Sequence, residues 1–231
     1  MPDVRHPNDD GAVSDERPWS PGRTAAVCSQ LAVIVTARSA WHRELAMLAL
    51  AVTALAVSAR VSVPVPGSPV PQSLQTLAVV LVGASLGSLR GGLALALYLL
   101  VGAIGMPVFA DGAAGAEHLV GPTSGYLVGF VAAAALVGWS AELAREGFLR
   151  AFLLMALGHL LILALGWLRL SFQLGSLDAL EAGVLPFLWG GVAKSAAGAA
   201  AWTVWWRWRV SRSPPLGCDG PTVEPRLETN G

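Results

Sequence analysis

Two ionisable side chains, Lys194 and His159, lie within otherwise apolar segments of the 231-residue sequence and are its first candidates for chemistry. Lys194 is the only lysine of the chain, and His159 stands in the middle of a leucine-rich run. Ionisable groups inside a membrane are costly, so they usually face a cavity and contact a ligand or another polar group. We expect both side chains to contribute to a ligand-binding site. The alternatives are a neutral His159 that a backbone or hydroxyl group satisfies, and a Lys194 whose role is structural alone.

The glycine-rich segment Gly121–Phe130 reads GPTSGYLVGF and has the features of a helix N-terminus. A proline suits the first turn of a helix, and Thr123 can cap amides that have no partner. Such free amides attract anions. We therefore predict that the backbone of Gly121–Gly125 holds a ligand carboxylate. Gly125 and Gly129 also have the GxxxG spacing that lets two helices approach closely.

The composition indicates that membrane helices position these groups. Hydrophobic residues make up 54% of the chain and charged residues only 13%, whereas about a quarter of a soluble domain is charged. The formal net charge is zero, which gives no electrostatic footprint for nucleic acid. Cys28 and Cys218 stand far apart and outside any metal-binding spacing, so we expect no disulfide, metal site or cofactor. The sequence predicts an all-α, polytopic membrane protein.

Six apolar segments are long enough to cross a membrane if the bilayer thins locally around the shorter ones. They are Trp41–Ala59, Leu74–Leu89, Gly91–Ile104, Ser124–Ala141, Phe148–Trp167 and Val184–Trp206. With the N-terminus inside, twelve arginines lie on the cytoplasmic side, and two, Arg60 and Arg169, lie in outer loops. Basic residues near spans are retained in the cytoplasm. We therefore predict six transmembrane helices in the plasma membrane, with both termini cytoplasmic.

This topology divides the chain into three parts. Residues 1–40 are expected to form a partly disordered cytoplasmic extension, residues 41–208 the six-helix domain, and residues 209–231 a disordered cytoplasmic tail. Neither end is expected to carry the activity.

The first outer loop, Val61–Ser73, alternates valine and proline. Such a sequence cannot continue a helix and favours an extended conformation. It is either a stiff lid over a pocket or a plain connector. Gln75 follows this loop directly, and its amide suits either a ligand contact or a helix cap.

The run from Pro69 to Phe130, PVPQSLQTLAVVLVGASLGSLRGGLALALYLLVGAIGMPVFADGAAGAEHLVGPTSGYLVGF, resembles the BioY family, the biotin substrate-binding components of energy-coupling factor transporters. The motifs LQTLAV, GxPVFA and GPTxGYLxGF carry the resemblance together, and it covers about residues 44–205. It implies a six-helix subunit that captures biotin from outside and docks onto a transmembrane coupling subunit driven by two ATPases. The chain itself lacks the glycine before Lys194 that an ATP-binding P-loop requires.

The resemblance places ligand-binding residues in these motifs and in the last two spans. We expect them at Gln75, Phe109, Asp111, Gly121, Thr123, Gly125, Tyr126, His159, Gly191 and Lys194. Family members usually carry an acidic residue where Gly191 stands, and there it partners the lysine and can accept the ureido hydrogens of the ligand. Because Gly191 can do neither, Lys194 needs another partner, which is a second group of the protein, water or the ligand.

Three functions remain open on the sequence. The first is a biotin-binding transport subunit, and the second is a transport subunit for another small anionic vitamin, such as lipoate or a biotin precursor. The third is a membrane-embedded enzyme that uses His159 with Asp178 or Glu181, although these carboxylates are expected in an outer loop without a paired motif. For the transport functions, the candidate surface for partner subunits is a face of small residues on the first span, made of Ala49, Thr53, Ala54 and Ser58.

Overall fold

The computed structural model describes residues 41–141 and 147–212, most of which are α-helical. The chain divides into two compact units between Ala46 and Met47. The elements that surround the site all belong to the second unit. The predicted extension 1–40 and the tail beyond residue 212 lie outside the described residues.

Each predicted span coincides with a helix. The first helix, Trp41–Ala59, and α4, Ser124–Ala141, have the predicted bounds. The other bounds differ: α2 is shorter than its predicted span, whereas α3, α5 and α7 are longer. These helices are α2 (Gln75–Leu86), α3 (Ser88–Ala103), α5 (Phe148–Leu174) and α7 (Leu185–Ser211). A further short helix, α6 (Ser176–Gly183), lies where an outer loop was expected. The described residues therefore hold seven α-helices rather than six.

Three of the described helices are long and apolar enough to cross a membrane: the first helix, α4 and α5. α2 and α3 have 12 and 16 residues. At a rise of about 1.5 Å per residue they are roughly 18 and 24 Å long, which is less than the roughly 30 Å of a hydrocarbon core. They form a helical hairpin in which Gly87 alone makes the turn, with a φ of 82° that favours glycine.

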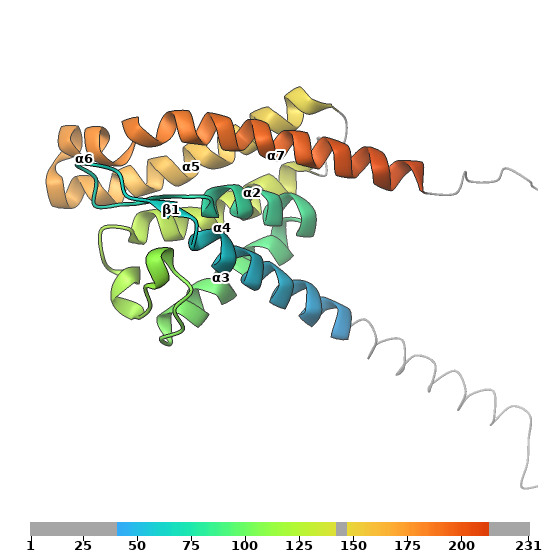
Figure 1. Cartoon of the computed structure of the whole chain (residues 1–231), viewed down its shortest axis with the longest axis horizontal. Coiled ribbons are helices and arrows are strands. Elements are labelled where there is room, and N and C mark those ends of the chain that lie inside the picture. The colour runs from blue at the N-terminus through green and yellow to red at the C-terminus, as the bar shows by residue number, and fades with distance from the viewer. Residues whose placement is uncertain (1–40, 142–146, 213–231) are drawn as a thin grey trace, which may run out of the picture. The chain divides into compact units, whose positions relative to one another are not determined.

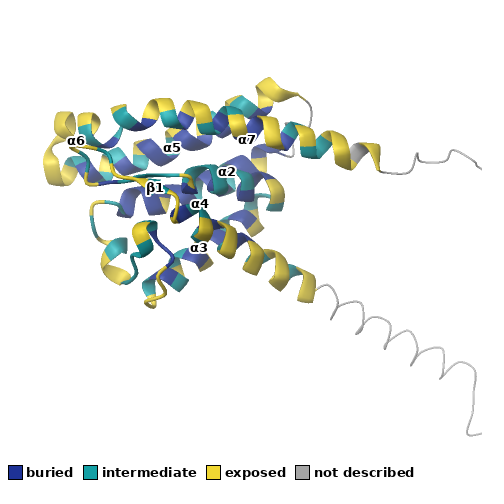
Figure 2. Cartoon of the chain, in the orientation of Figure 1, coloured by how far each residue is buried: buried dark blue, intermediate teal, exposed yellow. Residues whose placement is uncertain are grey.

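α4 lies at the centre of the second unit. It packs against α2, α3 and α5, and α7 packs in turn against α5 and α2 (Figure 1). Buried residues face this centre, whereas exposed ones gather on the outward faces of α5 and α7 (Figure 2). The core has two apolar clusters, one that includes Tyr98 and Phe130 and one that includes Met155 and Trp202. Phe109 belongs to the first cluster, so the helix core continues into the loop after α3.

The loops between the helices carry four short elements: β1 (Ser62–Val63), β2 (Gln72–Ser73), η1 (Ala110–Gly112) and η2 (Ala116–Leu119). β1 and β2 pair in an antiparallel ribbon at the two ends of the valine-proline loop. Arg60 donates from Nη2 to the carbonyl oxygen of Pro107 at 2.5 Å, and the hydroxyl of Ser62 donates to the carboxylate of Asp111. The valine-proline loop is thus fastened at two points to the loop that follows α3.

Candidate ligand-binding site

A cavity of about 510 Å³ lies among α2, α4, α5, α7 and the two fastened loops. Its volume is in the range of small-molecule pockets. Nine of the ten predicted ligand-binding residues line it, and Gly125 is the exception: the nine are Gln75, Phe109, Asp111, Gly121, Thr123, Tyr126, His159, Gly191 and Lys194. The fold therefore brings together side chains that lie as far apart in the sequence as α2 and α7.

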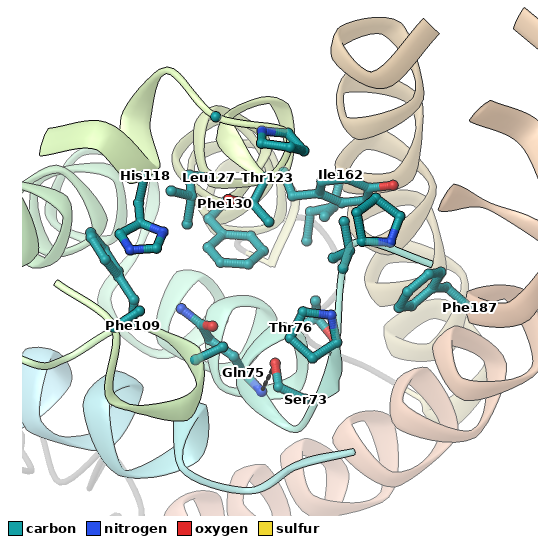
Figure 3. Close-up of a pocket in the computed structure, with 18 of the residues that line it drawn as sticks. Ser73, Gln75, Thr76, Phe109, His118, Thr123, Leu127, Phe130, Ile162 and Phe187 are labelled. Carbon is teal, nitrogen blue, oxygen red and sulfur yellow. Dashed lines mark hydrogen bonds between the residues drawn. The ribbon is translucent and has the colours of Figure 1, made fainter. Parts of the chain in front are cut away.

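The walls of the cavity combine an apolar surface with a few polar groups. Figure 3 shows Thr123, Leu127 and Phe130 on one side, across from Ser73, Gln75 and Thr76. Phe109 and His118 lie together at one end, with their ring centroids 5.7 Å apart, and Phe187 lies at the other. An apolar pocket with a small number of fixed polar groups is the usual form of a small-molecule site.

The valine-proline loop forms part of the cavity wall. Pro69, Val70, Pro71 and Ser73 all line the cavity. The loop therefore borders the cavity, as its interpretation as a cover requires.

Lys194 has protein partners in the place of a counter-ion. Its half-buried Nζ donates to the carbonyl oxygen of Ser73 at 2.5 Å and to the hydroxyl of Thr76 at 3.3 Å. Of the three partners that the sequence leaves open, the structure thus provides another group of the protein. An ammonium has three donors, so these two bonds leave one N–H for a ligand. Sequence reasoning missed both acceptors, although Thr76 stands beside Gln75 as a polar residue in the apolar LQTLAV motif.

His159 is 5% exposed and is bonded on one ring nitrogen only. Its Nδ1 lies 2.9 Å from the carbonyl oxygen of Met155 and 3.0 Å from the hydroxyl oxygen of Ser195. Because a carbonyl oxygen only accepts, Nδ1 carries the proton. The hydrogen bonds of Nδ1 agree with the alternative of a neutral histidine that backbone and hydroxyl groups satisfy. Nε2, in contrast, is the one buried side-chain polar atom among the described residues that has no hydrogen-bond partner.

Gly191 leaves room beside this imidazole. A Cβ atom placed on Gly191 would lie 3.8 Å from Cβ of His159 and 3.9 Å from its Cδ2, which are ordinary contacts. A side chain at this position would therefore fit and would lie against the ring of His159.

Gln75 contacts its neighbours through its side chain and is not a helix cap. Its Nε2 donates to the hydroxyl oxygen of Tyr98 at 2.8 Å, and this hydroxyl donates to the carbonyl oxygen of Val108 at 2.8 Å. α2 is preceded by Leu74, without a side-chain cap. Tyr98, which the sequence reading missed, thus holds Gln75 at the cavity wall. The hydroxyl of Tyr126 donates to the carbonyl oxygen of Gly183 at 2.7 Å, which leaves its ring at the cavity.

Gly125, which we predict to bind the ligand, does not line the cavity and packs against α5. A Cβ atom on Gly125 would collide with the carbonyl oxygen of Leu165 and with Cβ of Arg169, both on α5. A Cβ atom on Gly129 would lie 3.0 Å from Cα of Ile162 on the same helix. The GxxxG spacing therefore serves the close approach of α4 to α5.

Arg169 lies on α5 rather than in an outer loop, and it fastens the start of α4. Its Nε donates to the hydroxyl oxygen of Ser124 at 3.0 Å, and its Nη2 donates to the carbonyl oxygen of Val120 at 2.5 Å. The backbone N–H of Ser124 is bonded to the carbonyl oxygen of Gly121. One of the amides predicted to bind an anion, that of Ser124, is thus already bonded within the protein. Gly121 and Thr123, in contrast, line the cavity.

The carboxylates proposed for an enzyme are not in the site. Asp178 and Glu181 lie on α6 and are not among the residues that line the cavity. The partners of His159 are Met155 and Ser195. The structure therefore forms no acid–base pair between His159 and either carboxylate.

Comparison with known proteins agrees with this geometry. The model of the BioY family matches residues 28–211. Biotin transporter BioY2 of Lactococcus lactis subsp. cremoris is 37% identical over 66% of this chain and 84% of its own length. Biotin transporter BioY of Thermotoga maritima is 39% identical over 64% of this chain and 86% of its own.

The fold has a counterpart among solved structures. The crystal structure of the S-component for biotin from an ECF-type ABC transporter superposes with a TM-score of 0.66, at 23% identity, over 74% of this chain and 93% of that chain. The two chains thus share a fold. From the family match and the two transporters, the chain belongs to the BioY family.

Proposed function

We propose that this chain is the biotin-binding S component of an energy-coupling factor importer, which captures biotin from the external face for ATP-driven uptake. Membership of the BioY family carries the proposal. The relatives are transporters rather than enzymes, and the cavity supplies a site of suitable size.

The polar groups of the cavity suit the two ends of biotin. Its cyclic urea presents a carbonyl oxygen and N–H groups, and the third N–H of Lys194 matches the carbonyl. The apolar rings of Phe109 and Phe130 cover the bicyclic ring and the alkyl chain. The carboxylate lies toward Gly121 and Thr123, at the start of α4, where a helix N-terminus favours an anion.

The chain spans the plasma membrane six times, with both termini in the cytoplasm. The six spans are the first helix, α2, α3, α4, α5 and α7, because α6 has only 8 residues and is too short. Residues 1–40 form the cytoplasmic extension, and the residues that follow α7 form the tail. The valine-proline loop and the loop that follows α3, both of which line the cavity, then face outward.

Transport requires partner proteins, namely a transmembrane coupling subunit and two ATPases. Ala49, Thr53 and Ala54 on the first helix are exposed. Small exposed residues on one helix let another helix approach closely. This face is the proposed docking surface for the coupling subunit.

Binding of radiolabelled biotin, desthiobiotin and lipoate to the purified protein in detergent tests the function. We expect saturable binding of biotin and weaker binding of lipoate, which has a carboxylate but no urea. Saturable lipoate binding without biotin binding would instead identify a subunit for another anionic vitamin. The absence of saturable biotin binding would refute the proposal.

A further inference from the structure

The outward faces of α3 and α5 each carry a stripe of exposed apolar residues, and the two stripes differ in length. On α3 these residues follow one another at three- and four-residue spacing, and they are Leu89, Leu93, Leu97, Leu100 and Ile104. On α5 they are Leu149, Leu153, Leu157, Leu160, Leu168 and Phe172. At a rise of about 1.5 Å per residue the α3 stripe is roughly 22 Å long and the α5 stripe roughly 34 Å. The two faces therefore fit bilayers of different thickness.

The elements next to α3 do not lengthen its stripe. Arg90 is exposed at the start of the helix. At the other end the chain turns back, because the amide of Met106 donates to the carbonyl oxygen of Val101 at 3.2 Å. The loop that follows carries the exposed carboxylates of Asp111 and Glu117. Charged groups at both ends thus limit the apolar surface to the length of α3 itself.

Lipid suits the α3 stripe better than a protein helix does. The residues of the stripe are large, whereas helices in membranes approach one another closely through small residues. Two of the small residues of α3 face inward: a Cβ atom on Gly91 would lie 3.0 Å from Cα of Gly83 on α2, and Ala94 is fully buried. α2 is shielded, since Ser85 is its only exposed residue. The surface that the hairpin presents to lipid is therefore that of α3.

The α3 stripe is too short for an ordinary bilayer. A hydrocarbon core is about 30 Å thick, so the stripe falls short of it by roughly 8 Å even when the helix stands upright, and tilting only increases the shortfall. We propose that the bilayer thins at the α3 face alone, and that this face recruits phospholipids with short acyl chains while the α5 face takes chains of ordinary length. The inference goes beyond the proposed function and rests only on its membrane topology.

The test compares the lipids next to α3 and next to α5 in one bilayer. Cys28 and Cys218 are replaced by serine, and a bimane fluorophore is attached at the middle of one stripe, in Leu97→Cys or Leu160→Cys, which are both exposed positions. Each protein is reconstituted into equal amounts of dimyristoleoyl and dierucoyl phosphatidylcholine, with either the short or the long lipid brominated so that it quenches the fluorophore. The ratio of quenching by the short lipid to quenching by the long lipid is compared between the two positions. This comparison cancels the difference between the brominated lipids themselves.

We expect the ratio to be at least about twofold higher at Leu97 than at Leu160, because a lipid that matches the local apolar length is preferred. An equal or lower ratio at Leu97 would refute the recruitment of short lipids by α3. If neither lipid quenches the fluorophore at Leu97 while both quench it at Leu160, α3 does not face lipid, and the proposed topology fails together with the inference.

Two controls keep these outcomes separate from folding and from transport. The melting temperature of each labelled protein in detergent reports folding, and Leu93→Cys, which is also exposed, replaces Leu97→Cys if that labelled protein is unfolded. Binding of biotin to the wild type is measured separately, so the loss of the transport function and the loss of this inference are distinguished.

Discussion

Replacing Lys194 by alanine removes the only lysine of the chain, and we expect biotin to bind at least tenfold more weakly. Nζ is bonded to Ser73 and Thr76 and has one further N–H for the ligand. A hydrogen bond to a charged group contributes about 1.5–3 kcal/mol. At about 1.4 kcal/mol per factor of ten, its loss weakens binding by roughly tenfold to one hundred and fiftyfold.

The same change has a smaller effect on stability. The carbonyl oxygen of Ser73 and the hydroxyl of Thr76 lose a donor, but both residues are only half-buried and line the cavity, where water can replace the ammonium. We expect the free energy of unfolding to fall by about 1 kcal/mol. The variant therefore remains folded, and its dissociation constant can be compared with that of the wild type.

Titration of purified protein with radiolabelled biotin measures the affinity, and the melting temperature in detergent reports folding. Arg150→Ala is the matched control, because it removes an exposed positive charge outside the cavity. The single lysine offers a second assay: an amine-reactive reagent modifies Lys194 and the N-terminus alone, and biotin should protect Lys194. An unchanged dissociation constant in folded Lys194→Ala, together with no protection, would show that Lys194 only fastens Ser73 and Thr76.

Three further predictions address packing, topology and the space beside His159. Gly125→Val should lower the melting temperature, because its side chain meets the backbone of Leu165. The control Gly92→Ala should not, because its Cβ atom would lie 3.8 Å from Cβ of Ala135. Equal melting temperatures would contradict the close approach of α4 and α5. With Cys28 replaced by serine, Ala116→Cys, in the loop that follows α3, should react with an impermeant thiol reagent outside intact cells, whereas Cys218 should not. Labelling of Cys218 alone would reverse the topology. Gly191→Asp should tighten biotin binding, because the carboxylate fits beside His159 and adds an acceptor; weaker binding would indicate a pocket shaped for another ligand.

Most of the helical architecture could be predicted because apolar runs encode it directly. Two of the six predicted spans coincide in their bounds with observed helices. α6 was missed because its eight residues, which include Asp178 and Glu181, are polar enough to read as a loop. The end of α5 was missed for a related reason. The charge of Arg169 predicts a loop. Its guanidinium is instead bonded to Val120 and Ser124, and α5 continues past it to Leu174.

The sequence could predict which residues line the site, but not how they contact one another. The sequence identified Lys194 and His159 but not their partners, because Ser73 is 121 positions from Lys194 and only the fold brings them together. The GxxxG spacing predicts a face of α4 that lets another helix approach closely, but it does not identify that helix. For Gly125 that helix is α5.

Charged side chains near the outer loops and those in the cavity have different tasks. Arg60, Asp111 and Arg169 are each bonded to another part of the protein and fasten loops. Lys194, in contrast, lines the cavity and has one N–H beyond its bonds to Ser73 and Thr76. A carboxylate end of the ligand at the start of α4 would meet backbone dipoles that any small anionic vitamin satisfies equally. On the proposed function, discrimination between vitamins that share a carboxylate must therefore come from the other end of the ligand, where the remaining N–H of Lys194 would favour a C=O group.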